Sequence, residues 1–144
     1  MFKVNIYIET SLKGPGKRKG CYASVIEYQK RNGEMHKRMD VGIEEKTTYH
    51  RSVLLALLKS LNRLNTSSDL TIYTDSTYLI FSVERGRLQH WSENGFISAK
   101  KKEIANKEEW QQVDRLLKGH KVRFYYVKEH KYSSELKEKC QIDR

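Results

Sequence analysis

The alternation of apolar and polar residues near the start of the chain predicts strands before any helix. Apolar residues occupy every second position over residues 4–8, which is the period of a strand with one buried face. Residues 21–29 and 35–43 have the composition of two further strands, and the pair Asn32-Gly33 between them is typical of a hairpin turn. We therefore expect three consecutive antiparallel strands, the first over residues 3–10.

The period changes after this point. Leucines spaced three and four residues apart follow Thr48, which predicts a helix that the Thr48 side chain caps. The apolar run at residues 70–74 is typical of a buried strand, and residues 122–127 predict a fifth strand. Further helical patterns cover residues 75–93 with an interruption at Gly86, residues 107–118 and residues 133–141.

This order predicts a single α/β domain over residues 1–144, with helices flanking a five-stranded mixed sheet. Three antiparallel strands come first in the sequence, and two parallel strands follow. Tyr125 and Tyr126 lie in the last strand, and we expect at least one of them to pack into the core.

Composition narrows the setting and the partners. The 144 residues include 28 Lys and Arg against 18 Asp and Glu, a formal net charge of +10, which favours polyanion partners and nucleic acid above all. The alternative is a protein whose lysines are simply solvated. No apolar run approaches the roughly 20 residues of a membrane span, and no signal-peptide pattern is visible. Cys21 and Cys140 suggest neither a disulfide framework nor a zinc cluster, so we expect small unpaired residues in a reducing cytoplasm.

Five local sequences, in order along the chain, carry a resemblance to a known family. They are Glu9-Thr10-Ser11 after the first strand, Thr48 followed by Arg51 at the start of a helix, Thr74-Asp75-Ser76 between a strand and a helix, Asn106 followed by Trp110, and Val127-Lys128-Glu129-His130. Together they resemble ribonuclease H, type 1, over nearly the whole chain. The resemblance implies a ribonuclease H-like fold and recognition of RNA/DNA hybrids.

The family cleaves the RNA strand of a hybrid with two Mg²⁺ ions held by four acidic residues, assisted by a histidine. On this resemblance the candidate catalytic residues are Glu9, Asp75, His130 and Glu138, and Glu9, Asp75 and Glu138 are the candidate ligands of Mg²⁺ or Mn²⁺. Carboxylates suit this task because hard cations prefer anionic oxygen.

The acidic set departs from the family pattern. Glu9 stands where Asp is usual, Val53 stands where the first-helix Glu belongs, and either Glu138 or Cys140 falls at the last acidic position. Two carboxylates offset little of the dehydration and mutual repulsion of two divalent ions. We therefore expect cleavage to be weak or lost. Asp75 can instead cap a helix, and His130 can be a solvated imidazole.

The residues that bind nucleic acid in the family are better preserved. Thr48, Arg51 and Asn106 fall at positions that hold a DNA-strand phosphate, and all three offer hydrogen-bond donors to an anion. The remaining candidates for nucleic-acid binding are Trp91 and Phe96, in a segment that resembles the substrate-handling protrusion, and the basic residues Lys100, Lys101 and Lys102. Core packing of the aromatic rings and solvation of the lysines are the alternatives.

Three functions remain open from the sequence. The first is a monomeric, cytoplasmic protein that binds RNA/DNA hybrid, or alternatively double-stranded RNA, and cleaves RNA weakly or not at all. The second is an active metal-dependent hybrid ribonuclease that uses Glu9, Asp75 and Glu138. The third is a protein-interaction domain on the same fold.

Overall fold

A five-stranded sheet forms the centre of the computed structural model, which describes residues 2–98 and 100–140. The strands are β1 (Phe2–Thr10), β2 (Arg18–Gln29), β3 (Met35–Thr47), β4 (Ser68–Thr74) and β5 (Lys121–Tyr126). Their order in the sheet is β3-β2-β1-β4-β5. Strand β2 pairs antiparallel with β1 and β3, whereas β4 pairs parallel with β1 and β5. The predicted mixed sheet is therefore confirmed.

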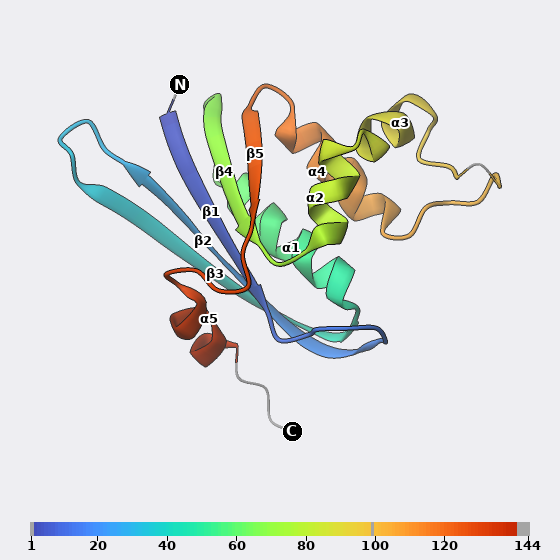
Figure 1. Cartoon of the computed structure of the whole chain (residues 1–144), viewed down its shortest axis with the longest axis horizontal. Coiled ribbons are helices and arrows are strands. Elements are labelled where there is room, and N and C mark those ends of the chain that lie inside the picture. Colours follow the sequence, from blue (N-terminus) through green and yellow to red (C-terminus); the bar gives the residue numbers. More distant parts are fainter. Residues whose placement is uncertain (1, 99, 141–144) are drawn as a thin grey trace.

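Helices cover the two faces of the sheet unequally. They are α1 (Tyr49–Leu61), α2 (Thr77–Glu84), α3 (Arg87–Glu93), α4 (Lys107–Leu117) and α5 (Ser133–Lys139). Helices α1 to α4 lie on one side, and α5 lies on the other (Figure 1). The expected last helix extended to residue 141, which lies outside the described residues.

The main core lies between the sheet and helices α1 to α4. The leucine spacing of α1 produces an apolar stripe, and Leu54 and Leu57 on this stripe are fully buried. Ile6 of β1, Ile72 of β4 and Trp110 of α4 are buried in the same cluster. The two central strands are thus fixed against the helices by large side chains without exposed surface.

Two helix caps set the geometry at one edge of the sheet. The Thr48 side-chain oxygen accepts a hydrogen bond from the Arg51 backbone N–H at 3.2 Å, so the predicted cap of α1 is confirmed. Helix α2 is capped by Ser76, whose hydroxyl accepts from the Leu79 N–H at 3.0 Å. Because Ser76 is the cap, the Asp75 carboxylate is available for other contacts.

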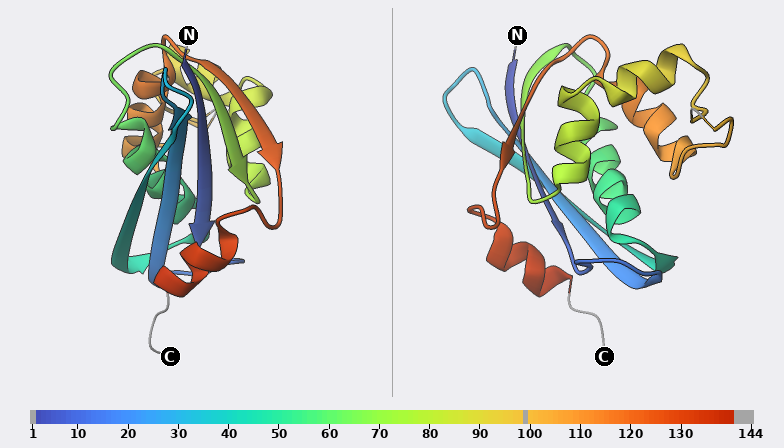
Figure 2. Two further views of the ribbon diagram at one scale, coloured as in Figure 1. Left: turned by 90° about the vertical axis from the view of Figure 1, so that its left-hand side faces the viewer. Right: turned by 45° about the vertical axis from the view of Figure 1, so that its right-hand side comes forward.

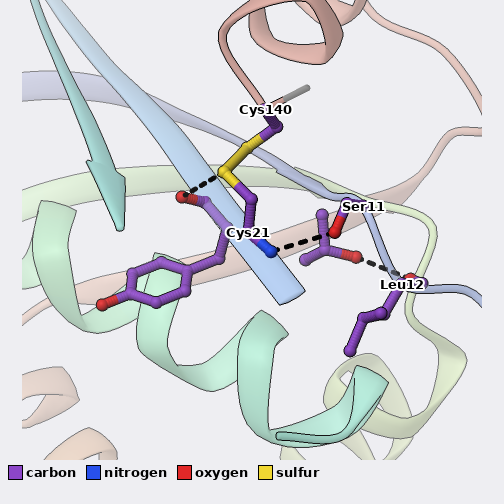
Figure 3. The surroundings of a disulfide bond; sticks show 6 residues. Ser11, Leu12, Cys21 and Cys140 are labelled. Carbon is purple, nitrogen blue, oxygen red and sulfur yellow. Dashed lines mark hydrogen bonds between the residues drawn. A yellow bond between two sulfur atoms is a disulfide. The ribbon is translucent and has the colours of Figure 1, made fainter. Parts of the chain in front are cut away.

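Cys21 and Cys140 form a disulfide, so the expectation of unpaired cysteines was wrong (Figure 3). They are 119 residues apart in sequence, and no local spacing indicates the pair. The fold brings them together because α5 packs over the start of β2, with the two Cα atoms 5.4 Å apart. Near the pair, the Cys21 N–H donates to the Ser11 hydroxyl at 2.9 Å. The disulfide therefore attaches α5 to the open face of the sheet.

The expectation that Tyr125 or Tyr126 packs into the core was also wrong. Their side chains are 51% and 52% exposed, respectively. Strand β5 lies at the edge of the sheet, and only its Phe124 side chain is buried.

Within the described residues, no helix is long and apolar enough to cross a membrane.

Breaking the disulfide should destabilise the protein. Closing a loop of this length restricts the unfolded chain, and such a bond contributes about 2–4 kcal/mol to the free energy of unfolding. Urea unfolding with and without dithiothreitol measures the difference. The double variant Cys21→Ser/Cys140→Ser is the control, and its urea midpoint should not respond to the reductant. Equal midpoints for the unsubstituted protein in both conditions would contradict the expectation.

Candidate nucleic-acid site

The carboxylates of Glu9 and Asp75 lie at one edge of the sheet, and the Lys13 ammonium bridges them. Glu9 is near the end of β1, and Asp75 directly follows the parallel neighbour β4. Lys13 Nζ lies 2.7 Å from Asp75 Oδ2 and 3.4 Å from Glu9 Oε1. The Glu9 side chain is only 4% exposed, so its charge is well shielded from water and depends on this partner.

Tyr49 closes the other side of Asp75. Its hydroxyl donates a hydrogen bond to Asp75 Oδ1 at 2.5 Å, and its ring lies 5.4 Å from Lys13 Nζ. Burial, together with the hydrogen bond to Asp75, raises the pKa of Tyr49 far above its ordinary value. The phenol therefore stays protonated and remains a donor, and both Asp75 oxygens have partners from this chain.

The other candidate acids do not join this pair. Val53 is fully buried in the core, on the inward face of α1. Glu138 is exposed on α5, and Cys140 is consumed by the disulfide. Within residues 2–98 and 100–140, no group of three His, Cys, Asp or Glu side chains could hold a metal ion. The two converging carboxylates, already paired with an ammonium, do not fit the two divalent ions that the resemblance implies.

Both ring nitrogens of His130 are engaged by the backbone. Nε2 lies 3.1 Å from the Ile8 carbonyl oxygen, and Nδ1 accepts from the Tyr132 N–H at 3.2 Å. This pattern corresponds to a neutral ring with its proton on Nε2. Burial lowers the pKa of His130 below its ordinary value, although the hydrogen bond to Ile8 acts in the opposite direction. His130 therefore fixes its loop against β1 in the present arrangement.

A buried carboxylate on β2, which the sequence analysis missed, anchors the same loop. Glu27 accepts hydrogen bonds from the Tyr132 hydroxyl at 2.6 Å, the Tyr7 hydroxyl at 3.0 Å and the Asn5 amide at 3.0 Å. Lys131 Nζ lies 2.8 Å from the Glu27 carboxylate. Burial disfavours the charged form, but these four donors outweigh it and lower the pKa of Glu27 to about 2. The cluster holds the segment before α5 on the sheet.

Thr48, Arg51 and Asn106 line one open cavity of about 700 Å³. Lys17, Lys46 and Lys107 also lie along it, together with Glu103, Glu108 and Glu109. The three residues that the family resemblance assigns to a phosphate are thus brought together, with both cations and carboxylates beside them.

Arg51 already has anionic partners in this cavity. Its Nε donates to Glu109 Oε1 at 3.2 Å, and its Nη1 lies 3.8 Å from Glu44 Oε1. A phosphate bound here must therefore compete with two carboxylates of the chain itself. Affinity at this position then depends on the surrounding lysines as well as on Arg51.

The remaining sequence candidates divide into packing and exposed groups. Trp91 is half-buried and meets Trp110 edge to face, with ring centroids 5.5 Å apart. Phe96 is buried in the main core. Lys100, Lys101 and Lys102 are all exposed. The lysines are accessible to a polyanion, whereas the two aromatic side chains support the protrusion that carries them.

The sequence of this chain is similar to those of known proteins. Residues 2–142 match the family model described as RNase H. Ribonuclease H of Acetivibrio thermocellus is 32% identical over 141 residues, which cover 97% of this chain and 90% of that protein. Ribonuclease H of Francisella tularensis subsp. novicida is 36% identical over 129 residues, which cover 89% and 80%, respectively.

Solved structures share the same fold at lower identity. LC9-RNase H1, a type 1 RNase H with the type 2 active-site motif, is similar with a TM-score of 0.75 and 23% identity, over 94% of this chain and 70% of that chain. The foamy viral protease-reverse transcriptase in complex with RNA/DNA hybrid is similar with a TM-score of 0.69 and 20% identity, over 86% of this chain and 17% of that chain.

Removing the Lys13 ammonium should create affinity for divalent cations. Lys13→Met leaves Glu9 and Asp75 adjacent without a countercharge, so Mn²⁺ should bind about tenfold more tightly or better than to the unsubstituted protein. Calorimetric titration with MnCl₂ measures the affinity, and Mn²⁺ should also raise the Tm of the variant. Lys30→Met removes the same charge far from the pair and serves as the control. Equal Mn²⁺ affinity in both variants would refute the expectation.

Glu27 should make stability depend on pH in acid. Its folded-state pKa of about 2 lies below the ordinary 4.5, so the carboxylate stabilises the fold above pH 4.5, and this contribution is lost as the pH falls towards 2. The shift corresponds to about 3 kcal/mol in the free energy of unfolding. Glu27→Gln should remove it and flatten the acid limb of a stability–pH curve measured by urea unfolding. Glu84→Gln, which removes an exposed carboxylate of α2, should leave the curve unchanged.

Proposed function

Because this chain belongs to the ribonuclease H family, we propose that it binds RNA/DNA hybrid and cleaves the RNA strand weakly or not at all. Ribonucleases H generally use divalent metal ions for cleavage, so cleavage depends on the acidic residues that would hold the ions. Hybrid binding depends on other residues, those that contact the nucleic-acid backbone. The cavity lined by Thr48, Arg51 and Asn106 supports binding. The state of the acidic residues argues against efficient cleavage.

The observation that carries the proposal is the Lys13 ammonium between Glu9 and Asp75. A single positive charge at 2.7 Å and 3.4 Å bridges the two carboxylates and offsets one of their two negative charges. A divalent cation would have to displace this ammonium and also lose water of hydration, and the part of the chain that the structure describes brings no third acidic or histidine ligand to the pair to offset the cost. Val53, at the family's first-helix acid position, is fully buried and offers no ligand atom.

The distribution of charge supports a phosphate backbone as the ligand. The chain carries a net charge of +10, and the cavity around Arg51 is lined by Lys17, Lys46 and Lys107 as well as by three glutamates. Contacts of this kind release counterions from the nucleic acid, so the affinity falls as salt rises. The ion pairs of Arg51 with Glu109 and Glu44 lower the net gain from a phosphate at this position, which favours moderate affinity over tight binding.

One observation favours a second candidate, an active hybrid ribonuclease. Glu9 and Asp75 remain adjacent, since both contact the same ammonium. A flexible lysine side chain can leave when a substrate phosphate and a divalent ion arrive together, and Glu138 would then be the third ligand. This candidate requires α5 to bring Glu138 towards the pair.

Binding is tested by fluorescence anisotropy with a labelled RNA/DNA hybrid. The dissociation constant should rise steeply between about 50 and 200 mM salt. Arg51→Ala should weaken binding about fivefold to tenfold, because it removes a charged donor from the cavity. Lys30→Ala, at the β2–β3 turn, is the control for the loss of one positive charge. No hybrid binding at low salt would overturn the proposal.

The same hybrid, incubated with Mg²⁺ or Mn²⁺, tests cleavage. We expect turnover far below that of an active ribonuclease H measured in parallel. Cleavage at a comparable rate that disappears in Asp75→Asn would replace the proposal by the second candidate.

A further inference from the structure

Beyond the hybrid cavity, the sheet face opposite helices α1 to α4 carries a row of tyrosines. Helix α5 covers only one end of this face (Figure 2). Tyr7 of β1, Tyr73 of β4 and Tyr125 of β5 are direct partners in the strand register. They therefore lie side by side across three neighbouring strands.

The rings of this row stack against one another. The centroids of Tyr7 and Tyr73 are 4.7 Å apart with nearly parallel planes, and those of Tyr73 and Tyr125 are 5.6 Å apart at 23°. The inner end is closed by Tyr132, which meets Tyr7 edge to face at 5.0 Å. The outer end is Tyr125, which is 51% exposed on the edge strand of the sheet. The stack thus ends in an accessible ring.

Cations flank the outer part of the row on one side. Lys121 and Arg123 lie on β5 at alternate positions before Tyr125, so their side chains leave the same face of the sheet. Lys3 of β1 lies on this face as well. It is the register partner of Asp69 on β4, which is in turn the register partner of Lys121 on β5. Asp69 is the acidic residue of this group, and it forms an ion pair with Arg123, with 3.5 Å between Asp69 Oδ1 and Arg123 Nη2. The row of rings therefore has these cations on one side and the Glu9–Asp75 pair, two residues further along β1 and β4, on the other.

From this combination we infer that Tyr125 is a stacking position for an unpaired base of single-stranded DNA or RNA, with Lys121 and Arg123 contacting its phosphates. Every base has a π-face, so an exposed ring beside cations binds single strands with little sequence preference. A protein partner with an aliphatic surface would gain no binding energy from these charges, so they favour a nucleic acid as the ligand. The inference rests on the proposed nucleic-acid function and adds a second contact, separate from the hybrid cavity at Arg51.

The test is fluorescence anisotropy at low salt with two labelled probes, a ten-residue oligothymidine and a ten-residue oligouridine. Tyr125→Ala should weaken binding of both probes about tenfold, and Tyr125→Phe, which keeps the ring, should retain the affinity. Tyr126→Ala is the matched control, because it removes a ring of 52% exposure on the opposite side of the strand. The affinity of Tyr125→Ala for a blunt-ended hybrid should stay within twofold of the unsubstituted protein.

Two results would overturn the inference. One is that neither probe binds, and the other is that Tyr125→Ala binds both as tightly as Tyr126→Ala. Single-strand binding that depends on Tyr125, in a protein that does not bind hybrid, would support the inference and overturn only the proposed hybrid function.

Discussion

The parallel pairing of β1 with β4 is the constraint on which the functional features depend. These strands are far apart in sequence but adjacent in the sheet, and their shared direction places their carboxyl ends at one edge. Glu9 and Asp75 meet there for this reason. Two residues earlier on each strand, the same register places Tyr7 against Tyr73. One pairing therefore creates both the charged edge and the aromatic row.

At the charged edge, the Glu9 and Asp75 carboxylates are paired with an ammonium of the same chain where the family holds metal ions. Burying like charges together is costly unless a positive charge offsets them. Lys13 supplies that charge from the loop directly after β1, four residues beyond Glu9, and the Tyr49 hydroxyl adds a neutral donor. The chain itself thus supplies one positive charge and one neutral donor to the two carboxylates.

Periodicity and motif order were sufficient to predict the five strands, their mixed arrangement and the Thr48 cap, because these features depend on local patterns. The partners of Glu9 and Asp75 could not be predicted in this way. Lys13 lies in a turn with no motif, Tyr49 is a variable position between Thr48 and Arg51, and only the folded chain brings them to the pair. Glu27 was missed for the same reason, since a lone acid within a strand gives no sign of four donors around it. The Cys21–Cys140 pair and the exposed Tyr125 depend on where α5 ends and which strand forms the edge.

The disulfide also determines how the molecule would respond to a pulling force. A force that pulls on the chain before Cys21 and after Cys140 passes covalently through the sulfur–sulfur bond, so residues 22–139 between the cysteines cannot be pulled out into an extended chain. Strand β1 precedes Cys21 and is outside this covalent loop, yet it lies in the middle of the sheet between β2 and β4. The mechanical strength of the oxidised protein therefore depends on the force needed to extract one central strand from its two neighbours.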